Sequence, residues 1–92
     1  MTTETLARSD RVLHRSVGDA VIATWQGRDD FDLLEGPAAV AWRLLSEPTD
    51  EPGLIESLAE IYEVSPEEIR EQVREMLEDW ERRGLLSREG TR

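Results

Sequence analysis

The fold of this protein is decided by residues 30–42, DFDLLEGPAAVAW, where a short apolar segment runs into a turn and then into a helix. Proline 37 has a preset φ angle and lacks only an N–H that the first helical turn would leave unpaired, so Gly36-Pro37 predicts a helix start. The sequence before this stretch alternates as strands do, and the sequence after it has helical periodicity. We therefore expect a small sheet followed by a helical layer.

Three short segments upstream of Gly36 predict an antiparallel sheet. Residues 11–17 (RVLHRSV), 20–25 (AVIATW) and 30–34 (DFDLL) each alternate between two faces, and turn-forming residues connect them. In the third segment Phe31 and Leu33 share one face, whereas Asp30 and Asp32 point the other way. A sheet of this size buries little by itself, so helices must cover its apolar face.

Three helices are predicted to supply that cover, over residues 37–46, 53–62 and 66–83, each with an apolar stripe at helical spacing. Ser65, Pro66 and Glu68 have the spacing of a capping box, and Gly84 is placed to end the last helix in a left-handed conformation. The predicted fold class is α+β and winged-helix-like, with a three-stranded antiparallel sheet followed by three helices.

The length and composition predict one domain. The chain has 92 residues, of which 38% are hydrophobic, and it has no cysteine. We assign residues 11–87 to this domain, residues 1–10 to a flexible N-terminal arm and residues 88–92 to a frayed tail. The N-terminal residues lack the apolar core of a secretory signal, and no run of apolar residues is long enough to span a membrane. We expect a cytoplasmic protein with no membrane partner.

Charge and motifs argue against nucleic acid binding and against catalysis. The net charge of −10, from 21 acidic and 11 basic residues, would repel a phosphate backbone, although acidic composition also serves solubility. His14 is the only histidine, so it has no partner for a metal pair or a catalytic triad. No phosphate-binding loop or nucleophile motif appears, and the carboxylates of residues 66–83 form a solvated helix face. We predict no enzyme, no cofactor, no metal and no nucleic acid partner.

An ordered set of residues from Leu34 to Leu86 resembles the PqqD-like family, the recognition elements that bind precursor peptides of ribosomally made natural products. Members typically show a strand ending in leucine and a polar residue, and then a helix with small residues, an aromatic residue and a leucine pair. The corresponding residues here are Leu34-Glu35, Ala38-Ala39, Trp42, Leu44-Leu45, Thr49, Tyr62, Val64-Ser65-Pro66 and Gly84-Leu85-Leu86. The chain departs from the family at Glu35 and Gln72, where asparagine and aspartate are frequent.

The resemblance implies that a precursor leader peptide adds as a further strand against residues 30–34, beside the last helix. The candidate peptide-binding residues are Asp30, Phe31, Asp32, Leu33 and Leu34 on the strand and Val73, Met76, Leu77 and Trp80 on the helix. Each of these helix residues also fits an ordinary core position, and the sequence does not say which margin of the helix faces the strand. The compact chain is most similar to the leader-binding protein of a lasso-peptide pathway, which implies a transglutaminase-like cysteine leader peptidase as the second partner.

Two other functions remain open from the sequence. Three strands with three helices also occur in winged-helix DNA-binding regulators, although the segment 66–83 holds seven acidic residues against four arginines. A dimerisation module without a ligand would use the same strand edge to pair with a second copy of the chain.

Overall fold

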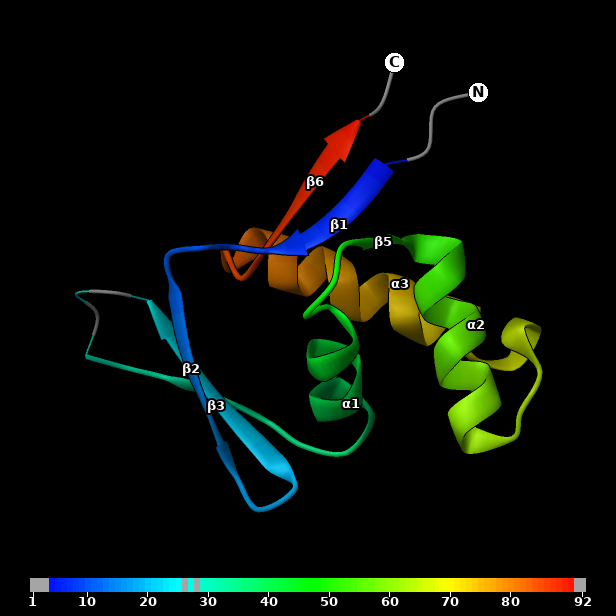
Figure 1. Ribbon diagram of the computed structural model, residues 1–92, viewed down its shortest axis with the longest axis horizontal. Helices are drawn as coiled ribbons and strands as arrows, with labels where there is room; N and C mark the ends of the chain where they lie inside the picture. Colours follow the sequence, from blue (N-terminus) through cyan, green and yellow to red (C-terminus); the bar gives the residue numbers. More distant parts are fainter. Residues whose placement is uncertain (1–3, 26, 28, 91–92) are drawn as a thin grey trace.

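The computed structural model describes residues 4–25, 27 and 29–90, and over these ranges it has three helices and two small antiparallel sheets (Figure 1). Strands β2 (Val12–Val17), β3 (Ala20–Trp25) and β4 (Asp32–Leu34) form one sheet in the order β2-β3-β4. Gly18 has a φ of 61°, the positive value that a two-residue hairpin turn requires at its first position. The predicted three-stranded sheet is confirmed, although its last strand begins at Asp32 and not at Asp30.

The three predicted helices are present as α1 (Pro37–Leu44), α2 (Glu51–Tyr62) and α3 (Pro66–Arg82). Helix α2 begins earlier than expected because the Asp50 side chain caps it, accepting a hydrogen bond of 2.7 Å from the Gly53 N–H. Ser65 is the N-cap residue of α3, but its side chain makes no capping hydrogen bond. Gly84 has a φ of 79°, which confirms the expected left-handed end of α3.

A second sheet was not expected from the sequence. Strands β1 (Glu4–Arg8), β5 (Thr49–Asp50) and β6 (Leu86–Gly90) pair in the order β5-β1-β6, with Glu4 opposite Gly90 and Arg8 opposite Leu86. The prediction of a flexible arm over residues 1–10 is therefore wrong for β1, and that of a frayed tail over residues 88–92 is wrong for the end of β6. Residues 1–3 and 91–92 lie outside the described residues.

The core joins both sheets to all three helices, and Trp42 of α1 lies at its centre. The Trp42 ring is fully buried and makes edge-to-face contacts with Trp80 and with His14, each at a centroid distance of 5.6 Å. The Arg8 guanidinium lies 5.0 Å from the Trp42 ring centroid, and its Nε donates a 2.9 Å hydrogen bond to the Trp42 carbonyl oxygen. These contacts link β1 and β2 to α1 and α3.

The helices of the described chain are too short or too polar to cross a lipid bilayer.

Candidate functional site

Strand β4 lies at an edge of its sheet. Among the described residues it pairs only with β3, through Val21 opposite Leu34 and Ala23 opposite Asp32, so its other side carries no strand. Leu34 is 5% exposed and faces the core, whereas Leu33 is 53% exposed and faces outward. This edge therefore offers main-chain N–H and C=O groups on the side away from β3, where an extended peptide can pair.

The residues before β4 do not continue the strand. Phe31 is 62% exposed, and Leu33, two residues later on the same face, is 53% exposed. The face that these two residues share is therefore the outward one. Asp30 is exposed in the loop, and its carbonyl oxygen accepts a 2.5 Å hydrogen bond from the Thr24 hydroxyl. The predicted strand segment of the site thus divides into a paired part, Asp32–Leu34, and a loop part before it.

One margin of helix α3 faces β4. The Arg83 guanidinium, just after the helix, forms an ion pair with the Asp32 carboxylate of β4, and its Nε lies 3.1 Å from Oδ2 of Asp79. The Trp25 ring N–H donates a 2.9 Å hydrogen bond to the Arg83 carbonyl oxygen. The margin that carries Gln72, Asp79 and Arg83 is therefore the one beside the strand edge, which decides between the two margins that the sequence left open.

Gly84 allows this close approach of the end of α3 to β3. A Cβ atom at position 84 would lie 2.2 Å from Cζ2 and 2.9 Å from Cε2 of the Trp25 ring, distances that real side chains do not reach. Only glycine accommodates both the positive φ and the ring. The Trp25 ring thus fixes where α3 ends relative to the sheet, and with it the position of Arg83.

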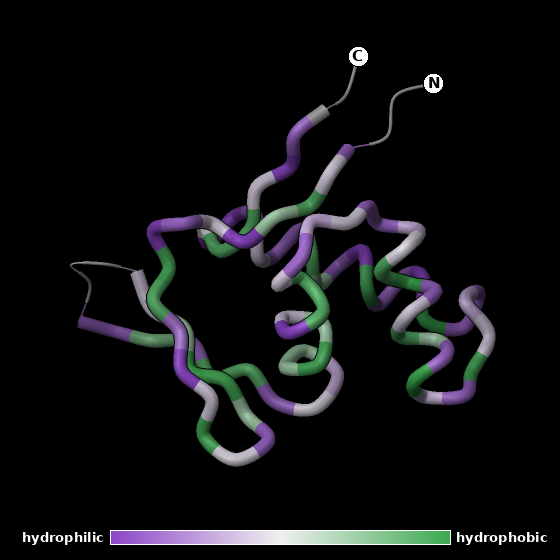
Figure 2. The backbone as a smooth tube through the Cα atoms, in the orientation of Figure 1, coloured by the Kyte–Doolittle hydropathy of each residue, from purple (hydrophilic) through white to green (hydrophobic). Residues whose placement is uncertain are grey.

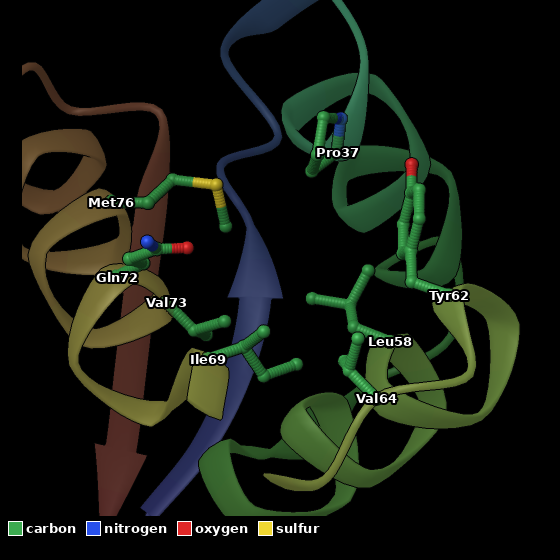
Figure 3. A pocket seen from close by; sticks show the side chains of 8 residues that line it. All are labelled: Pro37, Leu58, Tyr62, Val64, Ile69, Gln72, Val73 and Met76. Carbon is green, nitrogen blue, oxygen red and sulfur yellow. The ribbon is translucent and has the colours of Figure 1, made fainter. Parts of the chain in front are cut away.

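An apolar pocket of about 270 Å³ opens beside this margin, between α3, the end of α2 and the start of α1 (Figure 3). Figure 3 shows the α3 side chains on one wall and those of α1, α2 and the α2–α3 connection on the other. Its lining residues are Pro37, Leu58, Tyr62, Val64, Ile69, Gln72, Val73 and Met76. Pro37 follows soon after the last residue of β4, so the pocket lies near one end of the open strand edge.

Two of the four helix residues predicted to bind peptide lie at this pocket, and the other two do not. Val73 and Met76 line it. Leu77 is 0% exposed and Trp80 is 3% exposed, and Trp80 packs edge-to-face against Trp42. These two side chains therefore belong to the core, the alternative that the stripe pattern had left open.

Sequence reasoning missed the wall of the pocket that α2 and its flanking residues contribute. Leu58 and Tyr62 lie one turn apart on α2, and the apolar stripe of that helix extends nearly halfway round. A stripe this broad exceeds what packing against one neighbouring helix requires. Its width was the sequence signal that α2 could also contribute apolar side chains to a pocket. Ile69 of α3 also lines the pocket, and it is partly buried against the core.

The described residues contain no group of three or more histidine, cysteine or acidic side chains close enough to hold a metal ion. Burial, and then the positive charge of Arg8, lower the pKa of His14 below its usual value of 6.5. The His14 ring contacts the Trp42 ring of the core, and it lies 3.4 Å from a guanidinium nitrogen of Arg8.

Residues 33–86, which run from the strand edge through all three helices to β6, match the family model of coenzyme PQQ synthesis protein D, PqqD. This chain belongs to the PqqD family. The matched range includes every residue that lines the pocket, and it confirms the family that the motifs from Leu34 to Leu86 indicated. No curated protein matches the chain.

A solved structure extends the similarity of this PqqD-family chain beyond the matched range. The structure described as TbiB1 in complex with the TbiA(beta) leader peptide has a TM-score of 0.80 at 20% sequence identity. The similarity covers 88% of this chain and 94% of that chain, so it includes strands that precede residue 33. It confirms the α+β fold with its three-stranded antiparallel sheet and three helices.

Proposed function

We propose that this PqqD-family protein is a non-catalytic adaptor that binds the leader segment of a ribosomally made precursor peptide and delivers it to a leader peptidase. The observation that carries the proposal is the open edge of β4 beside an apolar pocket of about 270 Å³. The solved structure with the similar fold, TbiB1, is itself a complex with a leader peptide, which supports the same use of the fold here.

The strand edge supplies affinity that depends little on the leader sequence. Main-chain hydrogen bonds to β4 would order the leader as a fourth strand, and the alternation of its side chains would send every second one toward α3. The edge is only three residues long in the free protein, and a short edge resists pairing with other copies of itself. The ion pair of Arg83 with Asp32 lies at the first residue of β4, the end of the strand that is farther along the chain from the pocket residue Pro37.

The pocket supplies selectivity for the leader. Its lining is apolar except for the Gln72 amide and the Tyr62 hydroxyl, so it suits one large aliphatic or aromatic side chain. Burying such a side chain contributes about 2–3 kcal/mol. Part of the total binding free energy is consumed in ordering a disordered leader, so we expect moderate affinity.

The enzyme that receives the leader is proposed from the same family. The resemblance to the leader-binding proteins of lasso-peptide pathways supports a transglutaminase-like cysteine leader peptidase as this partner, in the cytoplasm. The adaptor would hold the precursor so that its cleavage site is presented to the peptidase, which raises the local concentration of substrate.

Titration of a labelled leader peptide, encoded by a precursor gene beside this one, tests the proposal by fluorescence anisotropy. Met76→Glu places a charge in the pocket wall, and we expect it to weaken leader binding about 30- to 100-fold, the equivalent of about 2–3 kcal/mol. Ile61→Glu is the matched control, because Ile61 is a 51% exposed side chain of α2 that is absent from the pocket lining. Absence of saturable binding to the wild-type protein, or equal affinity of the Met76→Glu variant, would overturn the proposal.

A further inference from the structure

The end of helix α3 is tied to two strands of the sheet through one residue, Arg83. Its carbonyl oxygen accepts a 2.9 Å hydrogen bond from the ring N–H of Trp25 in β3. Its guanidinium forms an ion pair with the Asp32 carboxylate of β4, and Nε lies 3.1 Å from Oδ2 of Asp79. We call these contacts the Arg83 bridge. The bridge joins α3 to β3 through the main chain and to β4 through the side chain.

Helix α3 itself orients the guanidinium of the Arg83 bridge. Asp79 lies one helical turn before Arg83, so its carboxylate holds the guanidinium from the helix side. The other carboxylate oxygen of Asp79 lies 3.2 Å from Nη2 of Arg82. Two adjacent arginines therefore pair with the same carboxylate, but they differ in what else they touch. Arg83 continues to the sheet, whereas the Arg82 side chain is largely exposed.

The ion pair lies on the helix side of the sheet and leaves the main-chain edge of β4 open. Asp32 and Leu34 are two residues apart, so their side chains share the face on which Leu34 is buried. Leu33 points the opposite way and is exposed. The main-chain N–H and C=O groups of the edge lie in the plane of the sheet, between these two directions. A leader that pairs with β4 therefore does not have to break the ion pair.

Strand β4 depends on few contacts for its position. It has three residues, and among the described residues it pairs on one side with β3. Its last residue, Leu34, is buried in the core, and Figure 2 shows hydrophobic residues at this end of the strand, next to the turn into α1. Its first residue, Asp32, is held by Arg83. Without the Arg83 bridge, the start of β4 would keep only its pairing with Ala23, and the strand would fray from that end.

We propose that Arg83 is a positioning residue for leader binding, an inference that rests on the proposed function. The Arg83 bridge keeps Asp32 in strand conformation before the leader arrives, so that the whole edge of β4 is ready for pairing. A preorganised edge loses less conformational entropy on binding, and the leader therefore binds more tightly. Fraying at Asp32 removes one of the three residues of this edge. The loss corresponds to roughly one main-chain hydrogen bond, or about five- to tenfold in leader affinity.

Arg83→Ala tests the proposal, because it removes the guanidinium and keeps the carbonyl oxygen that Trp25 binds. Affinity for the labelled leader peptide is measured by anisotropy, and stability is measured by urea unfolding. We expect Arg83→Ala to bind the leader about five- to tenfold more weakly than wild type. Its urea midpoint should stay close to that of wild type, because exposed ion pairs add little to stability. Arg83→Lys keeps the positive charge and should recover part of the lost affinity.

Arg82→Ala is the matched control, because Arg82 is the adjacent residue and pairs with the same Asp79 carboxylate. This variant should bind the leader within twofold of wild type. Hydrogen exchange of the free proteins is a second measurement, and it needs no leader. The amides of β4 that are protected in wild type should exchange faster in Arg83→Ala, and they should exchange at the wild-type rate in Arg82→Ala.

A double-mutant cycle separates positioning from direct contact with the leader. If Arg83 acts through Asp32, then Asp32→Ala should weaken leader binding as much as Arg83→Ala does. The double variant should then bind the leader no more weakly than either single variant. Should Arg83→Ala unfold in circular dichroism, Asp32→Ala is compared with Arg82→Ala under the same expectations.

Three results would overturn the proposal. Leader affinity of Arg83→Ala equal to that of wild type would show that the Arg83 bridge does not prepare the edge. Equal losses for Arg82→Ala and Arg83→Ala would assign the effect to net charge, and additive losses in the cycle would show that the two side chains contact the leader independently. Failure of wild type to bind any leader is a different outcome, because it refutes the proposed function, whereas the exchange of the β4 amides still tests the bridge.

Discussion

Replacement of Gly84 by alanine tests how the end of α3 is held against the sheet. The added methyl group would lie 2.2 Å from Cζ2 of Trp25, and the residue would have to keep a φ of 79°. The ring cannot withdraw freely, because its N–H is hydrogen-bonded to the Arg83 carbonyl oxygen next to the glycine. We expect the variant to be folded but clearly less stable than wild type.

The expected loss of stability has three contributions. The left-handed conformation costs an L-residue roughly 1–2 kcal/mol. Inserting a methyl group into an occupied site costs about 1–3 kcal/mol in displaced side chains and backbone. The reduced freedom of the unfolded chain returns about 0.4–1 kcal/mol. The free energy of unfolding should therefore fall by about 2–4 kcal/mol, a large share of the roughly 5–14 kcal/mol that a chain of this length possesses.

Urea unfolding followed by tryptophan fluorescence measures this loss, and Gly18→Ala is the matched control. Gly18 has a φ of 61°, but no atom lies within 4 Å of a Cβ built there, so only the conformational contributions apply. Gly18→Ala should cost about 1 kcal/mol or less. In a Trp25→Ala background the steric contribution disappears, so Gly84→Ala should cost no more there than Gly18→Ala does. Equal losses for the two glycine variants in the wild-type background would refute this account of Gly84.

Two further predictions concern β1 and the core beside it. Leu6→Ala should lower the free energy of unfolding by about 2–4 kcal/mol, because the Leu6 side chain is fully buried. Leu13→Ala is the control, and at a 55% exposed position it should lower the free energy of unfolding by about 0.5 kcal/mol or less. Equal urea midpoints for the two variants would show that β1 is not part of the folded unit. The pKa of His14, measured by NMR titration, should lie below 6.5 because burial and then the Arg8 charge disfavour the protonated ring. Since the unfolded chain then binds the proton more readily, the stability of wild type relative to His14→Gln should decrease from about pH 7.5 to about pH 5.5, and an increase over this range would contradict the direction of the shift.

Local sequence signals predicted the elements that local interactions determine. Alternation identified β2 and β3, and the prolines at 37 and 66 marked the first residues of α1 and α3. Gly84 was expected at the end of α3 because a left-handed residue is needed there, and its φ confirms this. The order of strands in the β2-β3-β4 sheet followed from the two short connections.

Features that depend on distant partners could not be predicted in the same way. Strand β1 is polar apart from Leu6 and Ala7, and its main partner β6 lies at the other end of the chain, so no short-range pattern reports the pairing. In DFDLL, apolar residues at both 33 and 34 fit either face, and the pairing of Leu34 with buried Val21 decides which one turns inward. The strand-facing margin of α3 likewise depends on the contact of Arg83 with Asp32, which joins residues far apart in the chain.

The pairing of Glu4 with Gly90 brings the first and last described strands together on one side of the molecule, away from the tip of the β2–β3 hairpin (Figure 1). A domain with neighbouring ends can be inserted into a surface loop of a host enzyme, or fused at either terminus, without a long linker. Both junctions would leave from the same place and keep clear of the hairpin. This geometry makes the domain a portable unit, suited to protein engineering by insertion or by circular permutation.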